Sequence, residues 1–223
     1  MKIKGIMPVF YIALAVIIVV LIINSFLPLE PKGDDSYPES RTSESKVLES
    51  EIDVSYDVAK IEDLSYSNIR RYQISVVVKN QPTTEQLKLV ARAIVNNFQE
   101  SDQDFNALSI QFYDYEEYVG FFGNTLGYVE FAPEGEWGKA DEVRTGDYNK
   151  MEYMFALKEK EWSKQLTEEE AEIFKQWKEI RQKHPNLEEE EINQQVAEDN
   201  GMSPEEVKNI MFKQVIWTHD DQK

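Results

Sequence analysis

Two segments of the chain bring aromatic rings, carboxylates and glycines close together, a mixture that sugar and peptide sites use. The segments are 113–127 (YDYEEYVGFFGNTLG) and 133–148 (PEGEWGKADEVRTGDY). Aromatic side chains offer flat apolar platforms, and carboxylates accept hydrogen bonds from hydroxyl and amide groups. The alternative interpretation is that the rings cover a sheet and the glycines form turns. The predicted ligand-binding residues are Asp114, Tyr115, Glu116, Trp137, Asp147 and Tyr148.

Hydrolysis is the catalytic reaction that these carboxylates allow. Most glycosidases place two carboxyl groups on either side of the bond that breaks. The chain has 42 acidic residues, so two neighbouring acids do not identify such a pair. It has two histidines, no cysteine, and no HExxH, G-x-S-x-G, P-loop or Rossmann motif. We therefore expect a binding protein rather than an enzyme, with no cofactor.

The metal-binding motif that the sequence matches best is a calcium loop. Asp102, Asp104 and Asn106 alternate as the first ligands of an EF-hand do. The motif then requires a glycine where Ala107 stands and a glutamate where Tyr113 stands. We expect a solvated turn here and no metal site.

The apolar pattern of residues 51–160 predicts an α+β domain that positions both segments. A helix begins at Thr83 between the second and third strands, and its apolar stripe ends at Phe98. A strand–helix–strand order predicts a right-handed crossover between parallel strands. We expect a two-layer domain with this one helix packed on the sheet. The five predicted strands are 52–64, 69–79, 106–113, 126–132 and 147–157.

Residues 161–223 have helical patterns throughout and predict an α-helical C-terminal hairpin or tail. Thr167 and Ser203 each begin a capping box, and Gly201 suits the C-terminal cap of a helix over 186–200. The segment 196–211 (VAEDNGMSPEEVKNIM) resembles a helix-turn-helix core, so a regulator that acts through 187–217 is an alternative function. The region 161–223 has 8 basic and 16 acidic residues, however, and contact with phosphate needs the opposite charge. We expect no nucleic-acid partner.

The N-terminal region 1–29 is expected to be a cytoplasmic stub and a transmembrane anchor. Residues 6–23 carry no charge, and as a helix they would be about 27 Å long, close to the thickness of a bilayer core. We therefore expect residues 6–27 to contact the lipid bilayer. Lys2 and Lys4 precede this run and acids follow it, which predicts a cytoplasmic N-terminus and a C-terminal domain outside the cell membrane. The rival is a cleaved signal peptide, but the run is long and lacks a small-x-small cleavage site.

The segment 30–50 predicts a disordered tether, because it is rich in serine, proline and charge and nearly free of apolar residues. The whole chain has a net charge of −18, and residues 51–223 contain 19 basic and 36 acidic residues. Such a charge opposes general electrostatic binding to nucleic acid or to an anionic bilayer. The absence of cysteine excludes disulfides and thiolate metal sites.

Three stretches resemble a family of uncharacterised bacterial domains that occur on secreted or membrane-anchored proteins. They are FNALSIQFYD (105–114), GYVEFAPEGEW (127–137) and GDY (146–148), and the resemblance covers about half the chain. The resemblance implies one α+β unit and a bacterial source. It implies no activity, so no catalytic role follows from it.

These patterns together predict a single-pass, membrane-anchored, extracytoplasmic binding or scaffolding protein for an envelope protein or a glycan. Two alternatives remain open. One is an envelope hydrolase that uses carboxylates of segments 113–127 and 133–148. The other is a helix-turn-helix-like regulator that acts through 187–217.

Overall fold

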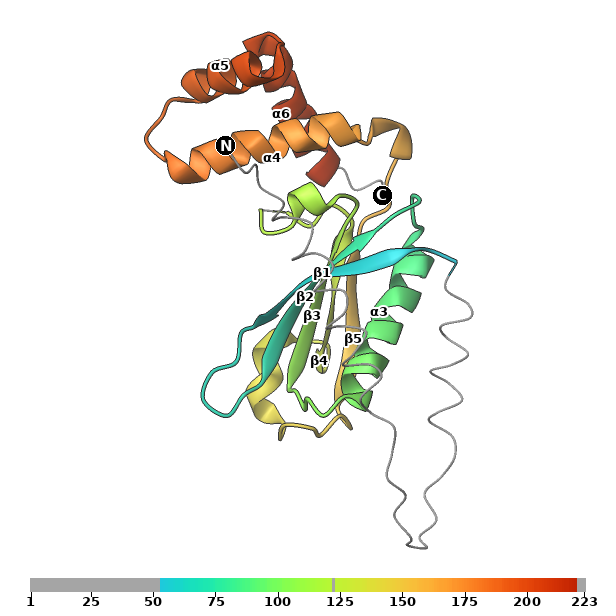
Figure 1. Ribbon diagram of the computed structural model, residues 1–223. Helices are drawn as coiled ribbons and strands as arrows, with labels where there is room; N and C mark the ends of the chain where they lie inside the picture. Colours follow the sequence, from blue (N-terminus) through green and yellow to red (C-terminus); the bar gives the residue numbers. More distant parts are fainter. Residues whose placement is uncertain (1–52, 122, 220–223) are drawn as a thin grey trace, which may run out of the picture. The chain divides into compact units, whose positions relative to one another are not determined.

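The computed structural model describes residues 53–121 and 123–219 (Figure 1). The predicted anchor and tether, residues 1–50, lie outside the described residues. Among those that the structure describes, no helix is both long enough and apolar enough to cross a bilayer. Every element described below belongs to one compact unit.

The described residues form an α+β fold with a mixed sheet of five strands and several helices, which confirms the α+β class and the five strands of the prediction. The strands lie in the order β1-β2-β3-β4-β5. The pair β2–β3 is parallel, as the intervening helix predicts, and the other pairs are antiparallel. The elements of the sheet domain are β1 (Tyr56–Asp63), β2 (Arg71–Val78), α3 (Thr84–Glu100), β3 (Ala107–Tyr113), β4 (Gly127–Pro133) and β5 (Met151–Leu157).

Two strands begin four residues later than predicted. β1 begins at Tyr56 rather than at residue 52, and its register with β2 shifts between Val58 and Lys60. β5 begins at Met151 rather than at Asp147. The Asp147 carboxylate accepts a hydrogen bond of 3.2 Å from the backbone N–H of Asn149. This bond favours a turn over an extended strand.

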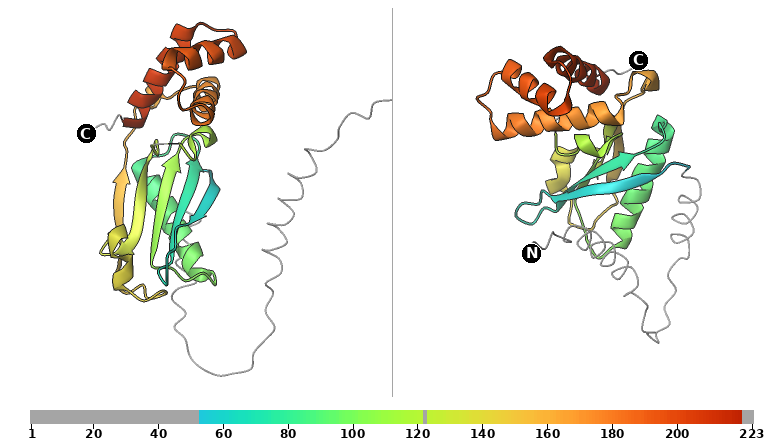
Figure 2. Two further views of the ribbon diagram at one scale, coloured as in Figure 1. Left: turned by 90° about the vertical axis from the view of Figure 1, so that its left-hand side faces the viewer. Right: turned by 45° about the horizontal axis from the view of Figure 1, so that its top comes forward.

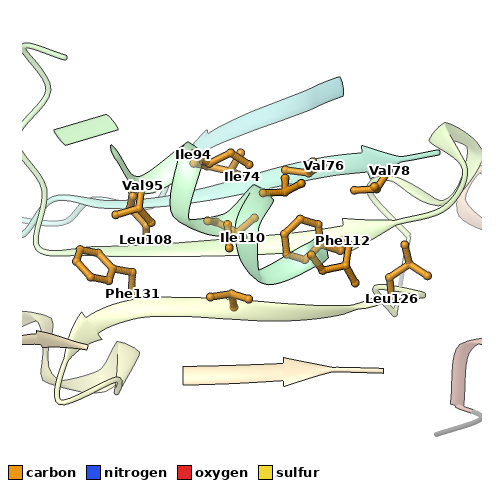
Figure 3. Packing of buried hydrophobic residues seen from close by; sticks show 14 of the residues in the cluster. Ile74, Val76, Val78, Ile94, Val95, Leu108, Ile110, Phe112, Leu126 and Phe131 are labelled. Carbon is orange, nitrogen blue, oxygen red and sulfur yellow. The ribbon is translucent and has the colours of Figure 1, made fainter. Parts of the chain in front are cut away.

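One face of the sheet packs against α3 and forms the main hydrophobic core (Figure 3). The Thr83 hydroxyl accepts from the N–H of Gln86, and the Gln86 side chain accepts from the N–H of Thr83, so the predicted capping box is confirmed. Alternate residues of the strands point to this face because side chains alternate along a strand. The buried residues labelled in Figure 3 are Ile74, Val76, Val78, Ile94, Val95, Leu108, Ile110, Phe112, Leu126 and Phe131.

The C-terminal region is helical, and its helices gather around a second core (Figure 2). Ser203 and Glu206 form the predicted capping box, with bonds of 3.3 Å and 2.7 Å between each backbone N–H and the other's side chain. Gly201 ends its helix in the left-handed conformation, with φ 68°, as predicted. The helices of this region are α4 (Glu168–Lys183), α5 (Glu189–Asn200) and α6 (Pro204–His219), preceded by the 3₁₀ helix η3 (Trp162–Lys164). Two further 3₁₀ helices lie in the sheet domain, η1 (Glu116–Tyr118) between β3 and β4 and η2 (Trp137–Glu142) between β4 and β5.

The second face of the sheet is covered at its two ends. At one end, Val77 and Tyr113 pack against Tyr118 of η1 and Phe174 of α4. At the other end, buried alanines of β3 and β4 pack against η2. The middle of this face carries polar side chains.

Candidate functional site

A shallow depression of about 350 Å³ lies on the second face of the sheet, between the two covered ends. Its floor comes from three neighbouring strands, because the register places Gln73 beside Ser109 and Ser109 beside Glu130. Gln111 and Tyr128 form the next cross-strand pair. We name this surface the sheet trough, and its lining residues are Leu64, Gln73, Ser109, Gln111, Asn124, Tyr128, Glu130 and Trp137.

Hydrogen bonds between neighbouring side chains hold the amides of the floor in place. The Gln111 amide donates to the Ser109 hydroxyl over 2.9 Å. Asn124, which precedes β4, donates from its amide to the Gln111 carbonyl oxygen. The Gln73 amide donates to the Glu62 carboxylate of β1 over 3.4 Å. The floor therefore presents oriented amide and hydroxyl groups rather than freely rotating ones.

Trp137 forms one wall of the sheet trough and is tied to its floor. The backbone N–H of Trp137 donates to the Glu130 carboxylate over 3.1 Å. The Arg71 guanidinium lies between two rings, 5.4 Å from the centroid of Trp137 and 5.0 Å from that of Tyr66. Stacking on a cation restricts the indole, so Trp137 is positioned as a fixed aromatic surface beside the polar floor.

A second polar depression, of about 380 Å³, lies between β1, η1 and α4. Lys60, Glu116 and Lys175 are among the residues that line it. Lys60 also donates to Glu62 over 2.7 Å, and Glu62 in turn accepts from Gln73 of the sheet trough. Polar side chains thus continue from the trough across the outer strand β1.

The structure separates the six predicted site residues into two groups. Asp114, Tyr115 and Glu116 follow β3, whereas Trp137, Asp147 and Tyr148 lie between β4 and β5. The antiparallel register pairs Phe112 with Gly127 at one end of β4 and Met151 with Pro133 at the other. The segments 113–127 and 133–148 therefore begin at opposite ends of the sheet, and each contributes one residue to the sheet trough, Asn124 and Trp137. Of the six predicted site residues, only Trp137 lines the sheet trough, and only Glu116 lines the second depression.

Asp114 and Tyr115 hold the C-terminal helices to the sheet. The Asp114 carboxylate is 6% exposed and accepts from Thr125 at 2.5 Å, Gln165 at 2.9 Å and Trp217 at 3.0 Å. Burial raises the pKa of this carboxyl, and the three donors oppose that rise. The Tyr115 hydroxyl donates to the Leu166 carbonyl over 2.9 Å. Because each bond crosses between distant parts of the chain, both side chains have a structural role.

Asp147 and Tyr148 also contribute to the architecture. The Asp147 carboxylate accepts from Asn149 and shapes the turn before β5. The Tyr148 ring lies 4.7 Å from that of Phe105, between ring centroids, and packs against the main core. Burial raises the pKa of Tyr148. These contacts agree with the alternative interpretation that aromatic residues of these segments cover the sheet.

Most of the residues that line the sheet trough were not singled out from the sequence. Ser109 and Gln111 alternate with apolar residues in β3, and Tyr128 and Glu130 do so in β4. The sequence predicted both strands but not the surface that these polar side chains form. Only the order and register of the strands bring the polar positions of β2, β3 and β4 together.

We compared the chain with models of protein families, with curated proteins and with solved structures, and none of them matches it. The resemblance to uncharacterised bacterial domains stays a resemblance.

The geometry of the sheet trough suits binding better than acid–base chemistry. Among the described residues that line it, Glu130 is the one carboxylate, and its oxygen accepts from the backbone of Trp137. Two opposed carboxyl groups are the usual requirement for glycoside hydrolysis. Over the described ranges 53–121 and 123–219, no group of three or more histidine and acidic side chains could hold a metal ion.

Proposed function

We propose that the protein is a single-pass, membrane-anchored, extracytoplasmic binding protein whose sheet trough binds a glycan. One observation carries this proposal: the second face of the sheet is covered at both ends and leaves a polar floor beside a fixed indole. A scaffolding role follows if the bound glycan belongs to the cell envelope.

The chemistry of the floor favours a glycan over a protein ligand. Amide, hydroxyl and carboxylate groups of Gln111, Ser109 and Glu130 match the many hydroxyl groups of a sugar, and Trp137 offers an apolar surface for a ring. Stable protein interfaces instead have a hydrophobic centre with a polar rim. Leu64 follows β1 and Trp137 follows β4, whereas the strand residues that line the trough are polar apart from the Tyr128 ring.

The membrane part of the proposal rests on the sequence of residues 1–50. An uncharged run at 6–23, preceded by Lys2 and Lys4, supports an anchor with its N-terminus in the cytoplasm. The polar, serine-rich segment 30–50 would then link the anchor to the folded region outside the membrane.

The two alternatives make different demands. A hydrolase would need a second carboxyl group opposite Glu130 across a bound sugar. A helix-turn-helix regulator would place the start of α6 against DNA phosphates, and that turn contains Glu205 and Glu206. Both acids are exposed, and they would repel phosphate.

The experiment that tests the proposal is a glycan array probed with the full-length chain purified in detergent. We expect binding to neutral oligosaccharides, with chitotetraose as the first individual probe. Tyr128→Ala should reduce the signal at least tenfold, because Tyr128 lines the sheet trough. Ile61→Ala is the matched control, since Ile61 is an exposed apolar residue of β1 whose partner Ile74 belongs to the opposite face.

Analysis of the oligosaccharides after incubation separates the proposal from its rivals. Unchanged chain lengths support binding, whereas shortened products that disappear in Glu130→Gln would establish the hydrolase. An absence of glycan binding, or binding that Tyr128→Ala leaves unchanged, would contradict the proposed role of the trough.

A further inference from the structure

Helix α6 has apolar residues on two sides, and only one side is covered. Val207, Ile210 and Trp217 face the core of the C-terminal helices and are buried. Phe212 is 66% exposed and Val215 is 52% exposed. A helix that is apolar all round is normally covered all round. The outer side of α6 is therefore an exposed apolar patch of the kind that marks an interaction site.

The exposed side of α6 borders a groove of about 390 Å³ between α4 and α6. Trp177 of α4 and Met211, Phe212 and Val215 of α6 supply its apolar lining. We name this surface the α4–α6 groove. Its place between two helices and its apolar walls suit a bound helix, which is a common way to recognise amphipathic peptides.

The charged lining of the α4–α6 groove is two lysines and one acid, Glu189, so it is net positive although the chain is strongly acidic. Lys178 and Lys208 line it, and within the ranges that the structure describes neither makes an ion pair. The Lys178 ammonium lies 5.8 Å from the Trp177 ring centroid, and the Arg181 guanidinium lies 5.1 Å from the same ring. Burial and the charge of Arg181 lower the pKa of Lys178. An incoming carboxylate would relieve this crowding of cations.

We propose that the α4–α6 groove docks an acidic amphipathic helix of a partner protein. The apolar face of that helix covers Phe212 and Val215, and its carboxylates pair with Lys178 and Lys208. This inference goes beyond the glycan-binding proposal, because the groove shares no lining residue with the sheet trough.

Two other occupants fit the charges less well. A second copy of the chain in a two-fold interface would bring the same lysines toward each other, since such an interface uses one patch twice. An anionic bilayer would meet Glu189 at the rim of the groove and Glu205 on α6 as well as the lysines. A helix that carries carboxylates opposite the two lysines alone fits this mixture of lysines and acids better than a uniformly negative surface does.

The test uses the full-length chain in detergent and two labelled 18-residue peptides, measured by fluorescence anisotropy. Both peptides carry leucines at i, i+3, i+4 and i+7, and their polar faces hold glutamates in one and lysines in the other. We expect the glutamate peptide to bind at least tenfold more tightly than the lysine peptide. Phe212→Ser and Lys208→Glu should each weaken its binding at least fivefold.

Matched control variants lie away from the groove. Ile61→Ser removes an exposed apolar residue of β1, and Lys150→Glu reverses an exposed charge between β4 and β5, so both should bind the glutamate peptide as the wild type does. Equal binding of the two peptides, or equal loss in groove and control variants, would overturn the inference. A dimer in sedimentation that Phe212→Ser dissociates would replace it with self-association. Loss of peptide binding on transfer from detergent to anionic nanodiscs would replace it with membrane contact.

Discussion

The indole N–H of Trp217 donates a hydrogen bond of 3.0 Å to the carboxylate of Asp114, a residue 103 positions earlier in the chain. Both partners are buried. Gln165, in the connection before α4, donates to the same carboxylate oxygen over 2.9 Å. The end of β3, the start of the helical region and the end of α6 therefore meet at one carboxyl group. We expect the attachment of the C-terminal helices to depend on it.

Replacing Trp217 with phenylalanine keeps an aromatic ring and removes the N–H. The change leaves the buried Asp114 carboxylate with one donor fewer, and such a loss costs about 1–3 kcal/mol of unfolding free energy. Thermal unfolding of the full-length protein in detergent measures it. Trp162→Phe is the control, because Trp162 packs 5.5 Å from Trp217 between ring centroids but makes no hydrogen bond to Asp114. Equal losses in the two variants would show that packing, and not this hydrogen bond, matters.

Stability should depend on pH through Asp114. Its pKa is raised in the folded protein above its usual value of about 4 by burial. The protonated form is therefore favoured by folding, so the stabilising contribution is complete below pH about 4 and is lost as the pH rises through the folded pKa. Asp114→Asn removes this titration. The unfolding free energy of the wild type minus that of Asp114→Asn should fall as the pH rises above about 4, and a difference that rises instead would contradict this assignment.

The capping box at the start of α6 should stabilise the C-terminal helices. The Ser203 hydroxyl accepts from the N–H of Glu206 over 3.3 Å, and the Glu206 carboxylate accepts from the N–H of Ser203 over 2.7 Å. Hydrogen bonds from Ser203 lower the pKa of Glu206. Ser203→Ala should cost about 1 kcal/mol and lower the melting midpoint by a few degrees, as measured by circular dichroism. Glu206→Gln should cost less, because glutamine can still accept, and Ser163→Ala serves as an exposed control.

Helix caps were predictable from the sequence, whereas the role of the buried Asp114 was not. Thr83, Ser203 and Gly201 were placed correctly because a cap depends on neighbours within about five residues. The parallel pair β2–β3 followed from a helix between two strands. Asp114 was instead predicted to bind a ligand, and the structure buries it against Trp217, Gln165 and Thr125. No local pattern connects residues so distant in sequence.

The sheet trough shows the same limit for a site. The sequence predicted β3 and β4 as strands, but none of their polar residues that line the sheet trough was predicted as part of a site. Their meeting depends on the register Gln111–Tyr128 and Ser109–Glu130, which long-range pairing sets. Trp137 was predicted because an aromatic residue in a glycine-rich segment suggests a site by composition alone.

The proposed topology predicts a specific pattern of proteolysis. Protease added to intact spheroplasts should remove the chain beyond residue 30 or so, because the segment 30–50 is polar and the positive-inside rule places it outside. Immunoblotting against a C-terminal epitope follows the loss, with a cytoplasmic protein as the control for membrane integrity. Survival of the C-terminal epitope until the membrane is lysed would place the folded region in the cytoplasm.

Isothermal titration of the full-length chain with the best oligosaccharide from the array tests the central claim most directly. We predict that Tyr128→Ala raises the dissociation constant at least tenfold while Ile61→Ala changes it less than twofold. Tyr128 lines the sheet trough, whereas Ile61 does not. Equal dissociation constants for the wild type and Tyr128→Ala would contradict the account, because the glycan would then bind somewhere other than this trough.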